Sequence, residues 1–445
     1  MDVKVVSSKL VKPSYPAGAP PPDTTEHVPY SVFDKVTYHM QMAIVYAFAP
    51  PGPPTADVER GLAAVLAAYR PYAGQVRPGP DGAPGVLLND RGALLVEASV
   101  RNARLADVAP AKPAPLLRRL HPGVEGPIEE VVRVQLTRFA CGSLAVGFTS
   151  HHAVADGRAT GDFLAAWGRA ARGLPVGPPP PRHHRGLFPP RDPPRVEFEH
   201  RGVEYYRPPP PSRHDEEARR RHGSIVVHDV HFTKDIIAEL RAKASEGRRR
   251  GGGQFSRFEA ILAHVWRAMT HARGLGAGDP GRASTIRISV DGRRRLPAPP
   301  GYFGNLVLWA FPRATVGDLL GLPLGHAAQA IHDAVARLDA AYFQSFVDFA
   351  SSGAVEAEAL EPTAVLDKDA LCPDLDVDSW LTLPFGELDL GGGGPAYIMP
   401  PYIPTEGMLF LVPSCLGDGG GGVDAFIPLF EHHLEAFKQC CYTID

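Results

Sequence analysis

The stretch TSHHAVADG, Thr149 to Gly157, decides how the rest of the chain is interpreted. Its first residues end a uniformly apolar run, SLAVGFTS (143–150), which predicts an inner strand. The residues after it, ATGDFLAAWGRAARGL (159–174), have the apolar spacing of a helix. The histidines His151 and His152 therefore lie in a strand-to-helix connection, where two rigid elements can hold a side chain at a cleft.

Three interpretations of this stretch compete. A metal site would need further ligands, and the nearest histidine-rich segment, RHHR (182–185), lies among prolines, so we predict no metal. A polar strand end with histidines bonded to the backbone is the second possibility. The third is a general base, because neutral imidazole is the side chain whose pKa lies nearest working pH. Two histidines, an acid and a glycine together after a buried strand favour the base.

Size and composition exclude several function classes. With 445 residues the chain is long enough for two or three domains of roughly 100–200 residues. Its composition, 44% hydrophobic and 21% charged with a net charge of −3, is that of a globular protein without a basic field for nucleic acid or an anionic membrane. Five scattered cysteines, no signal-like N-terminus and no apolar run near the about 18 residues of a membrane span predict a cytoplasmic protein.

The main change in composition is a proline-rich segment between two halves. Proline fixes φ and removes a hydrogen-bond donor, so residues 176–222 predict an extended crossover linker. We therefore expect an N-terminal domain over 1–175 and a C-terminal domain over 223–445. Both halves mix helix and strand signals, and no glycine-rich nucleotide loop follows a strand.

Other elements are predicted from periodicity and end signals. Helices are expected at 57–74, with Asp57 as N-cap and Gly74 as stop, and at 233–246, 256–273 and 424–438. The third of these opens with a capping box of Ser256 and Glu259. Strands are expected at 131–139, 285–296 and 407–414.

HHAVADG resembles the H-x-x-x-D-G signature of the BAHD acyltransferases, plant enzymes that move an acyl group from coenzyme A to an alcohol or amine. Other landmarks stand in the family's order along the whole chain: VPYSVFDK (28–35), YFGN (302–305), and DSWLTLPFGELDLGGGGP (378–395) in place of a D-F-G-W-G segment. VDSW, the glycine-rich replacement and the ending CCYTID resemble grass N-hydroxycinnamoyltransferases that acylate agmatine, putrescine or tryptamine.

The resemblance implies an α/β (α+β) fold of two chloramphenicol-acetyltransferase-like domains, with mixed sheets, flanking helices and a substrate channel between them. The segment at about 370–400 is expected to cross to the interface. The implied protein is a monomer that uses acyl-CoA as co-substrate, with no permanently bound cofactor, no metal, and neither nucleic acid nor membrane as partner.

For the histidine motif, the resemblance makes His152 the catalytic base and His151 a packing neighbour. Asp156 is expected to turn away from the channel and to pair with Arg293. This pairing would fix the loop that runs from His152 to Gly157. The alternative from another functional class is a binding protein with the same fold and no catalytic activity. The intact base motif disfavours this alternative.

The glycine-rich segment departs from the family pattern, because Leu390 replaces an aromatic residue and Gly392 replaces a tryptophan. Only Asp389 and Gly391 are carried over, as structural residues at the domain interface. A mobile turn is the alternative for the glycines.

A second departure concerns the oxyanion. Asp378 stands where many relatives have a threonine that bonds the developing negative charge, and a carboxylate there would repel that charge. Either another donor serves, a backbone N–H or the indole N–H of Trp380, or Asp378 faces the acceptor instead.

Acidic residues predict a cationic acceptor. Asp376 and Asp378 are two apart, so on a strand they share a face and together could hold the distal cation of agmatine or putrescine. A solvated acidic loop is the alternative. Tyr38, His39 and Met40 stand where relatives line the acceptor pocket.

Basic residues after residue 246 predict the coenzyme A site. GRRRGGG (247–253) precedes Ser256 at a helix start, where hydroxyl and backbone N–H groups can meet a phosphate. The expected ligands are Arg248, Arg249, Arg250 and Ser256, and a solvated loop is the alternative. The predicted activity is hydroxycinnamoyl transfer to an aliphatic amine, with an aromatic amine or an alcohol as the alternative acceptor, and the sequence leaves the acyl group open.

Overall fold

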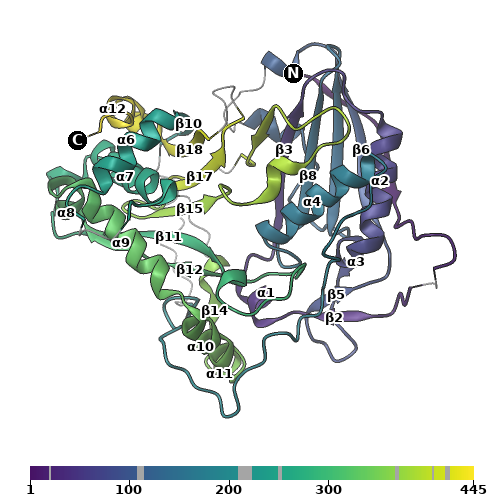
Figure 1. The fold of residues 1–445 in the computed structure, drawn as a ribbon, viewed down its shortest axis with the longest axis horizontal. Coiled ribbons are helices and arrows are strands. Elements are labelled where there is room, and N and C mark those ends of the chain that lie inside the picture. The colour runs from purple at the N-terminus through teal and green to yellow at the C-terminus, as the bar shows by residue number, and fades with distance from the viewer. Residues whose placement is uncertain are drawn as a thin grey trace.

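Two large mixed sheets organise the protein, as seen in a computed structural model (Figure 1). The structure describes residues 1–19, 22–107, 115–208, 223–248, 253–365, 370–402, 405–415 and 421–444. One sheet belongs mainly to the N-terminal half and the other to the C-terminal half, and the halves lie at the right and left of the figure.

The N-terminal sheet has six strands, and only the β6–β7 pair is parallel. In spatial order the strands are β1 (Val3–Val11), β6 (Ala93–Val100), β7 (Val132–Phe139), β8 (Leu144–His151), β3 (Gln41–Phe48) and β16 (Tyr397–Met399). The last of these comes from the C-terminal half and pairs antiparallel with β3. A small sheet of β2 (His27–Pro29), β5 (Gly85–Leu87) and β4 (Gln75–Val76) lies beside it.

Helices of the N-terminal half are α1 (Val32–Val36), α2 (Thr55–Ala68), α3 (Arg70–Ala73) and α4 (Gly157–Ala171). The expected helix at 57–74 is two helices, broken at Tyr69 before Pro71. Asp57 is not its N-cap, because α2 already starts at Thr55 after Pro54. Trp167 and Phe163 of α4 are fully buried against the sheet, which fixes the helix that follows the histidine motif.

The C-terminal sheet is built around central parallel pairs. Its strands in spatial order are β10 (Ile225–Phe232), β18 (Val423–Phe430), β17 (Met408–Pro413), β15 (Leu375–Ser379), β11 (Ala283–Asp291) and β12 (Val307–Ala310), with β13 (Arg313–Thr315) also paired to β11. Its helices are α6 (Lys234–Ala244), α7 (Arg257–Ala272), α8 (Val316–Gly321), α9 (Leu324–Arg337), α10 (Ala340–Ala350), α11 (Ala354–Ala357) and α12 (Leu434–Cys440).

The helix expected at 424–438 is wrong in its first part. Residues 423–430 form β18; a 3-10 turn over Glu431–His433 follows, and the α-helix begins only at Leu434. Pro428 cannot occupy a helix interior, and the strand is buried on both faces between β10 and β17, so its apolar run carries no alternation to separate it from a helix.

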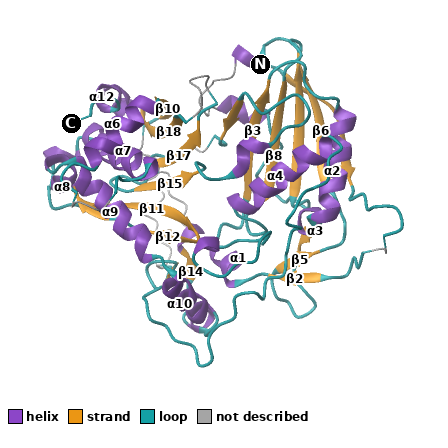
Figure 2. Cartoon of the chain, viewed as in Figure 1, coloured by secondary structure: helices purple, strands orange, loops and turns teal. Residues whose placement is uncertain are grey.

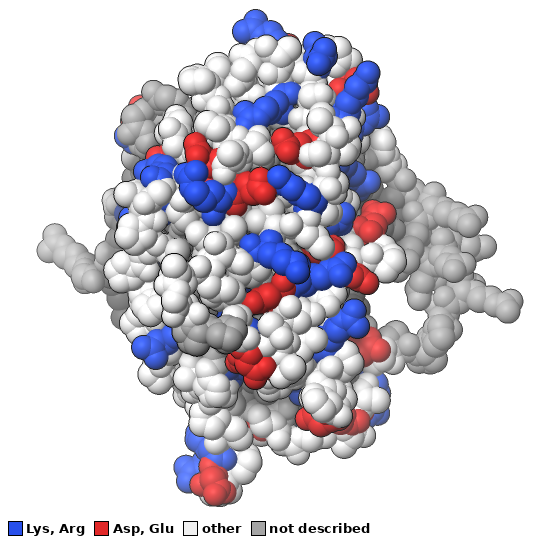
Figure 3. Space-filling model, turned by 90° about the vertical axis from the view of Figure 1, so that its right-hand side faces the viewer, with Lys and Arg blue, Asp and Glu red and all other residues white. Residues whose placement is uncertain are grey.

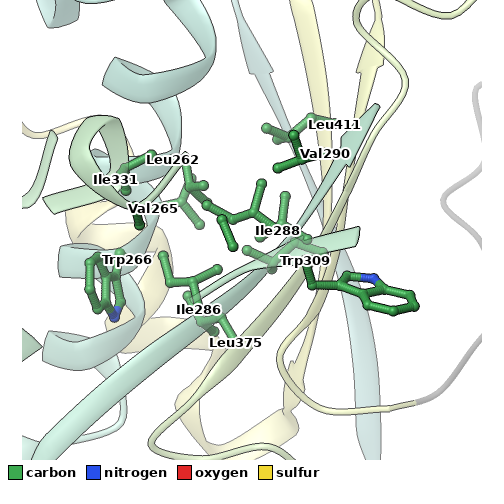
Figure 4. Close-up of a cluster of buried hydrophobic side chains, with 14 of the residues drawn as sticks. Leu262, Val265, Trp266, Ile286, Ile288, Val290, Trp309, Ile331, Leu375 and Leu411 are labelled. Carbon is green, nitrogen blue, oxygen red and sulfur yellow. The ribbon is translucent and has the colours of Figure 1, made fainter. Parts of the chain in front are cut away.

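Alternation along β11 and β15 separates the two faces of the C-terminal sheet. Ile286, Ile288 and Leu375 point toward the helices, where they pack with Trp266 of α7 (Figure 4). In the same view Trp309 of β12 lies on the opposite side of the sheet. Residues Arg287, Asp376 and Asp378 alternate with the helix-facing ones, so they share the face that looks toward the N-terminal half.

The crossover after α4 is anchored along its described part, in which loop predominates (Figure 2). The strand β9 (Tyr205–Tyr206) pairs with β14 (Glu361–Pro362). Arg191 forms an ion pair with the fully buried Asp348 of α10, with Nε 2.7 Å from Oδ2. The crossover is therefore held against the C-terminal half by specific polar contacts.

The surface carries both signs of charge. On the face in Figure 3, Lys and Arg side chains lie interspersed with Asp and Glu. Within the described part of the chain, no helix combines the length and apolar character needed to cross a bilayer.

Candidate active site

His152 directly follows β8 and is fixed by its backbone. Its N–H donates to the carbonyl of Met40 (2.9 Å), and its carbonyl accepts from Nδ2 of Asn305 (3.0 Å). The ring nitrogen Nδ1 lies 3.3 Å from Oγ1 of Thr37. Because Nδ1 is engaged there, Nε2 is the nitrogen that can meet a substrate; a base acting through Nε2 requires the tautomer in which Nδ1–H donates to the threonine hydroxyl. The residue is half-buried, so it is not sealed in the interior.

Burial keeps both histidines neutral. It lowers the pKa of His152, against the opposing effect of the Asp156 carboxylate. The pKa of His151 is lowered to about 4 by burial, with smaller contributions from His39 and His152. At neutral pH His152 is therefore unprotonated and able to accept a proton.

Asp156 does not contact the imidazole but ties its loop to the C-terminal half. Burial alone would raise the pKa of Asp156, but the Arg293 guanidinium and several hydrogen bonds outweigh that effect and lower it. Arg293 Nη1 lies 2.8 Å from Oδ2 and Nη2 3.1 Å from Oδ1, while Leu306 N–H donates to Oδ2 (2.9 Å). Oδ1 also accepts a hydrogen bond from the Ala159 N–H. Asp156 is therefore the N-cap of α4, the helix that begins at Gly157.

The wall opposite His152 is formed by Tyr38 and the C-terminal sheet. The Tyr38 ring packs edge-on against the His152 ring, with centroids 5.5 Å apart. The guanidinium of Arg287 donates to Tyr38 Oη and to Asp376 Oδ2, and it lies 5.9 Å from the Trp309 ring centroid. Burial raises the pKa of Tyr38, so its phenol stays neutral. His39 and Met40 follow in the chain and are exposed.

Asp378 is half-buried on the same face as Asp376. Its Oδ2 accepts the indole N–H of Trp380 (3.1 Å). Burial raises the pKa of Asp378 to about 6, and nearby Asp376 adds to the rise while Trp380 and Arg287 oppose it. The expectation that the Trp380 N–H could stabilise an oxyanion is wrong for this arrangement, because that N–H is already donated to a carboxylate. A backbone N–H as the oxyanion donor stays a prediction.

The expectation that Asp376 and Asp378 together hold the distal cation of the amine also needs correction. They share one face, but Asp376 is buried and neutralised by Arg287, with which it is in register across β11 and β15. Among the described residues, Asp378 is thus the carboxylate of the pair that has no guanidinium partner.

Asp389 organises the glycine-rich turn. Its Oδ1 accepts the N–H groups of Gly391 (2.9 Å) and Gly393 (3.0 Å), and its Oδ2 lies 2.9 Å from Arg172 Nη1. Gly391 has φ +110°, a conformation that side chains rarely adopt. Leu390 is buried against the N-terminal half, which takes the place of packing by an aromatic residue.

The expected coenzyme A residues are only partly described. Arg248 lies 3.8 Å from the Phe255 ring centroid and lines a hollow of about 490 Å³ with Gly325, His326 and Gln329. Arg249 and Arg250 lie outside the described residues.

The expectation for Ser256 needs a correction. Its N–H donates to Glu259 Oε2 (2.7 Å), and its hydroxyl accepts the Glu259 N–H (3.2 Å). The capping box predicted from the sequence therefore uses the two N–H groups that a phosphate would need, and its carboxylate would repel the phosphate. The Ser256 hydroxyl also interacts with the Glu259 carboxylate, whose pKa it helps to lower.

Sequence reasoning missed four residues that hold the site. Thr37, Arg185, Arg287 and Asn305 come from four separate segments, and nothing in their local sequence marks them. Asn305 belongs to the YFGN block and Arg185 to the proline-rich crossover, and neither pattern predicts a contact with the histidine loop. Among the described residues, no three or more His, Cys, Asp or Glu side chains gather as potential metal ligands.

Comparisons with known proteins find similarity over nearly the whole chain. A sequence model of the Transferase family matches residues 1–444. The chain is 70% identical to a putrescine hydroxycinnamoyltransferase and 47% identical to agmatine hydroxycinnamoyltransferase 1, both of Oryza sativa subsp. japonica; the alignments cover 100% of this chain, and 100% and 99% of those proteins.

Solved structures show the same fold. Vinorine synthase superposes with a TM-score of 0.72 at 21% identity, covering 100% of this chain and 99% of that one. F. graminearum TRI101, solved with coenzyme A and deoxynivalenol, gives a TM-score of 0.71 at 17% identity over 93% of this chain and 97% of its own. The predicted α/β fold of two acyltransferase-like domains with mixed sheets is confirmed; the boundaries at 175 and 222 stay a prediction.

Proposed function

The chain belongs to the Transferase family, the BAHD acyltransferases, and we propose that it moves a hydroxycinnamoyl group from coenzyme A to an aliphatic cationic amine, putrescine or agmatine. The predictions of family and of acyltransferase activity are confirmed. The observation that carries the proposal is a neutral, half-buried His152 near a sheet face on which the Asp378 carboxylate forms no ion pair with any described residue.

The reaction needs one base and an ordered transfer of protons. A primary ammonium has a pKa of roughly 10, so it must lose a proton before its nitrogen can attack. As the nitrogen attacks the thioester carbonyl, His152 Nε2 removes a further proton. The C–N bond forms, the C–S bond breaks, and the imidazolium returns its proton to the departing sulfur.

The structure of a diamine substrate suits a role for Asp378 in binding one of its two charged ends. One cationic end of a diamine against this carboxylate would form a charge-assisted contact and leave the other end free to lose its proton. Tyr38 flanks the same face and offers an apolar wall for a methylene chain. Similarity to a putrescine enzyme at 70% identity favours putrescine over agmatine.

For coenzyme A we propose the hollow at the start of α7. Arg248 and His326, which line it, supply donors for phosphate oxygens there. A relative of the same fold was solved with coenzyme A, which supports acyl-CoA as the co-substrate.

We also propose that the protein acts as a cytoplasmic monomer. All five cysteines are unpaired, as expected in a reducing compartment. Light scattering in solution would give the mass of one chain; the mass of two chains would contradict the monomer.

The test is a matrix of acyl donors against acceptors, with release of free thiol as the readout. Coumaroyl-, feruloyl-, caffeoyl- and benzoyl-CoA would each be offered putrescine, agmatine, tryptamine, tyramine and a simple alcohol. We expect the highest kcat/KM with a hydroxycinnamoyl donor and putrescine. A preference for tryptamine, tyramine or the alcohol would overturn the aliphatic-amine assignment.

A further inference from the structure

Arg185, in the proline-rich crossover, lies buried at the point where both halves meet the histidine loop. Only 3% of its side chain is exposed. Nη2 donates to the carbonyl of Val154 (2.6 Å), two residues after His152, and Nη1 donates to the carbonyl of Phe303 (2.6 Å). Nε lies 3.2 Å from Oδ2 of Asp34. One guanidinium thus contacts three segments.

A second route leads from the same guanidinium to His152. Asp34 is fully buried, and its Oδ1 accepts both the backbone N–H (3.2 Å) and the side-chain amide (2.8 Å) of Asn305. That amide also donates to the His152 carbonyl. Asp34 belongs to α1, which ends directly before Thr37, the partner of His152 Nδ1. The His152 carbonyl is therefore held through Asn305 and Asp34, and the partner of its ring follows directly after the helix that carries Asp34.

The backbone leaves space for this side chain. A Cβ added at Gly304 would lie 1.4 Å from Arg185 Nη1, so the guanidinium fills the place that any other residue there would need. A buried ion pair is no more stabilising than apolar residues of the same volume, so stability alone does not account for the arrangement.

We propose that Arg185 is a positioning residue, which sets the orientation of His152 by fixing Val154 and the Asp34–Asn305 pair. The crossover then takes part in building the active site in addition to joining the halves. This inference rests on the proposed function, because it assigns Arg185 a role in the same acyl transfer.

The main test compares Arg185→Lys with Arg191→Lys. Both keep the charge of a crossover arginine that pairs with a fully buried aspartate, but Arg191 pairs with Asp348 on α10 and not with the histidine loop. We expect Arg185→Lys to lower kcat by 10-fold or more, with KM for both substrates changed less than three-fold. Arg191→Lys should lower Tm comparably and leave kcat unchanged.

Gly304→Ala gives an independent route, because the new methyl displaces the guanidinium while Arg185 is retained. It should reproduce the kcat loss of Arg185→Lys. Equal kcat in the wild type, Arg185→Lys and Gly304→Ala, or an equal loss in Arg191→Lys, would overturn the inference.

A readout without turnover separates this inference from the proposed function. NMR of histidine-labelled protein, with His152→Gln to identify the signal, gives the titration of His152. A shifted His152 titration in Arg185→Lys but not in Arg191→Lys supports the positioning role even if no acyl transfer is detected. An unchanged titration in Arg185→Lys refutes the role whatever the activity matrix shows.

Discussion

Asp376 and Asp378 differ in their ability to bind a cation because Arg287 pairs with only one of the two. The sequence presents two equivalent carboxylates on one strand face. In the fold, Arg287 sits beside Asp376 and neutralises it, while Asp378 accepts the indole N–H of Trp380 and pairs with no described guanidinium. The negative charge that a cationic substrate would meet is therefore concentrated on a residue whose pKa lies near neutrality.

A pH dependence follows from the pKa of Asp378, which is raised to about 6. Between the ordinary carboxyl value of roughly 4 and about 6, the folded protein binds a proton that the unfolded chain does not, so this group lowers stability as pH rises. Asp378→Asn should therefore be more stable than the wild type at pH 7 in urea unfolding. Its KM for putrescine should rise about 10-fold or more, because a charged contact is lost.

The same group should appear in the kinetics of the wild type. We expect kcat/KM for putrescine to rise as pH passes through about 6, and that limb to be missing in Asp378→Asn. An identical pH profile and KM in the two proteins would refute a role for Asp378 in holding the amine.

The pKa of Asp156 is shifted in the opposite direction to that of Asp378, so its contribution to stability has the opposite pH dependence. Its lowered pKa means that the stability it contributes is present above the ordinary carboxyl pKa and is lost as pH falls through its folded value. Asp156→Asn keeps an N-cap for α4 but leaves Arg293 without its buried partner, and should cost about 3–5 kcal/mol at pH 7 in urea unfolding.

The exposed pair Arg172–Asp389 provides the control for Asp156. Asp389→Asn should cost no more than about 1 kcal/mol, because that pair is solvated. An equal loss of unfolding free energy in the two variants would show that the buried Asp156–Arg293 pair contributes no more stability than the exposed pair.

At the scale of elements, α4 is held by close contact with the turn that carries the glycine-rich segment. A Cβ added at Gly168 would lie 2.8 Å from the backbone N and O of Asp389. Glycine to alanine in a helix normally stabilises by about 1 kcal/mol, but here the methyl meets rigid backbone. We expect Gly168→Ala to destabilise by roughly 1–3 kcal/mol in thermal unfolding.

Gly321, at the end of α8, is the matched site with open space around its Cβ position. Gly321→Ala should leave Tm unchanged or raise it. Stabilisation by Gly168→Ala of the same size would mean that α4 and the turn are not in tight contact.

Elements with one buried face or a clear cap were predictable, and those without were not. The capping box of Ser256 and Glu259 predicts the start of α7, and the structure contains both the box and the helix. The apolar run at 423–430 has no periodicity, so only its partners β10 and β17 make it a strand. Contacts such as Tyr38 with Arg287, 249 residues apart, depend on the tertiary fold and leave no local pattern.

At the scale of the whole molecule, the site exists only where the halves meet. The N-terminal half provides His152, Thr37 and Tyr38, and the C-terminal sheet provides Arg287 and Asp378. Strand β16 and Arg185 connect the halves around this seam. The histidine motif indicated the base, whereas the opposite wall could be known only from the packing of the two sheets.

The most direct measurement is thiol release from coumaroyl-CoA with putrescine, comparing the wild type with His152→Ala. We predict amine-dependent release by the wild type and a loss of about 10²–10⁴-fold in kcat for the variant, at unchanged Tm. Release by His152→Ala at the wild-type rate would contradict the assignment of this imidazole as the base.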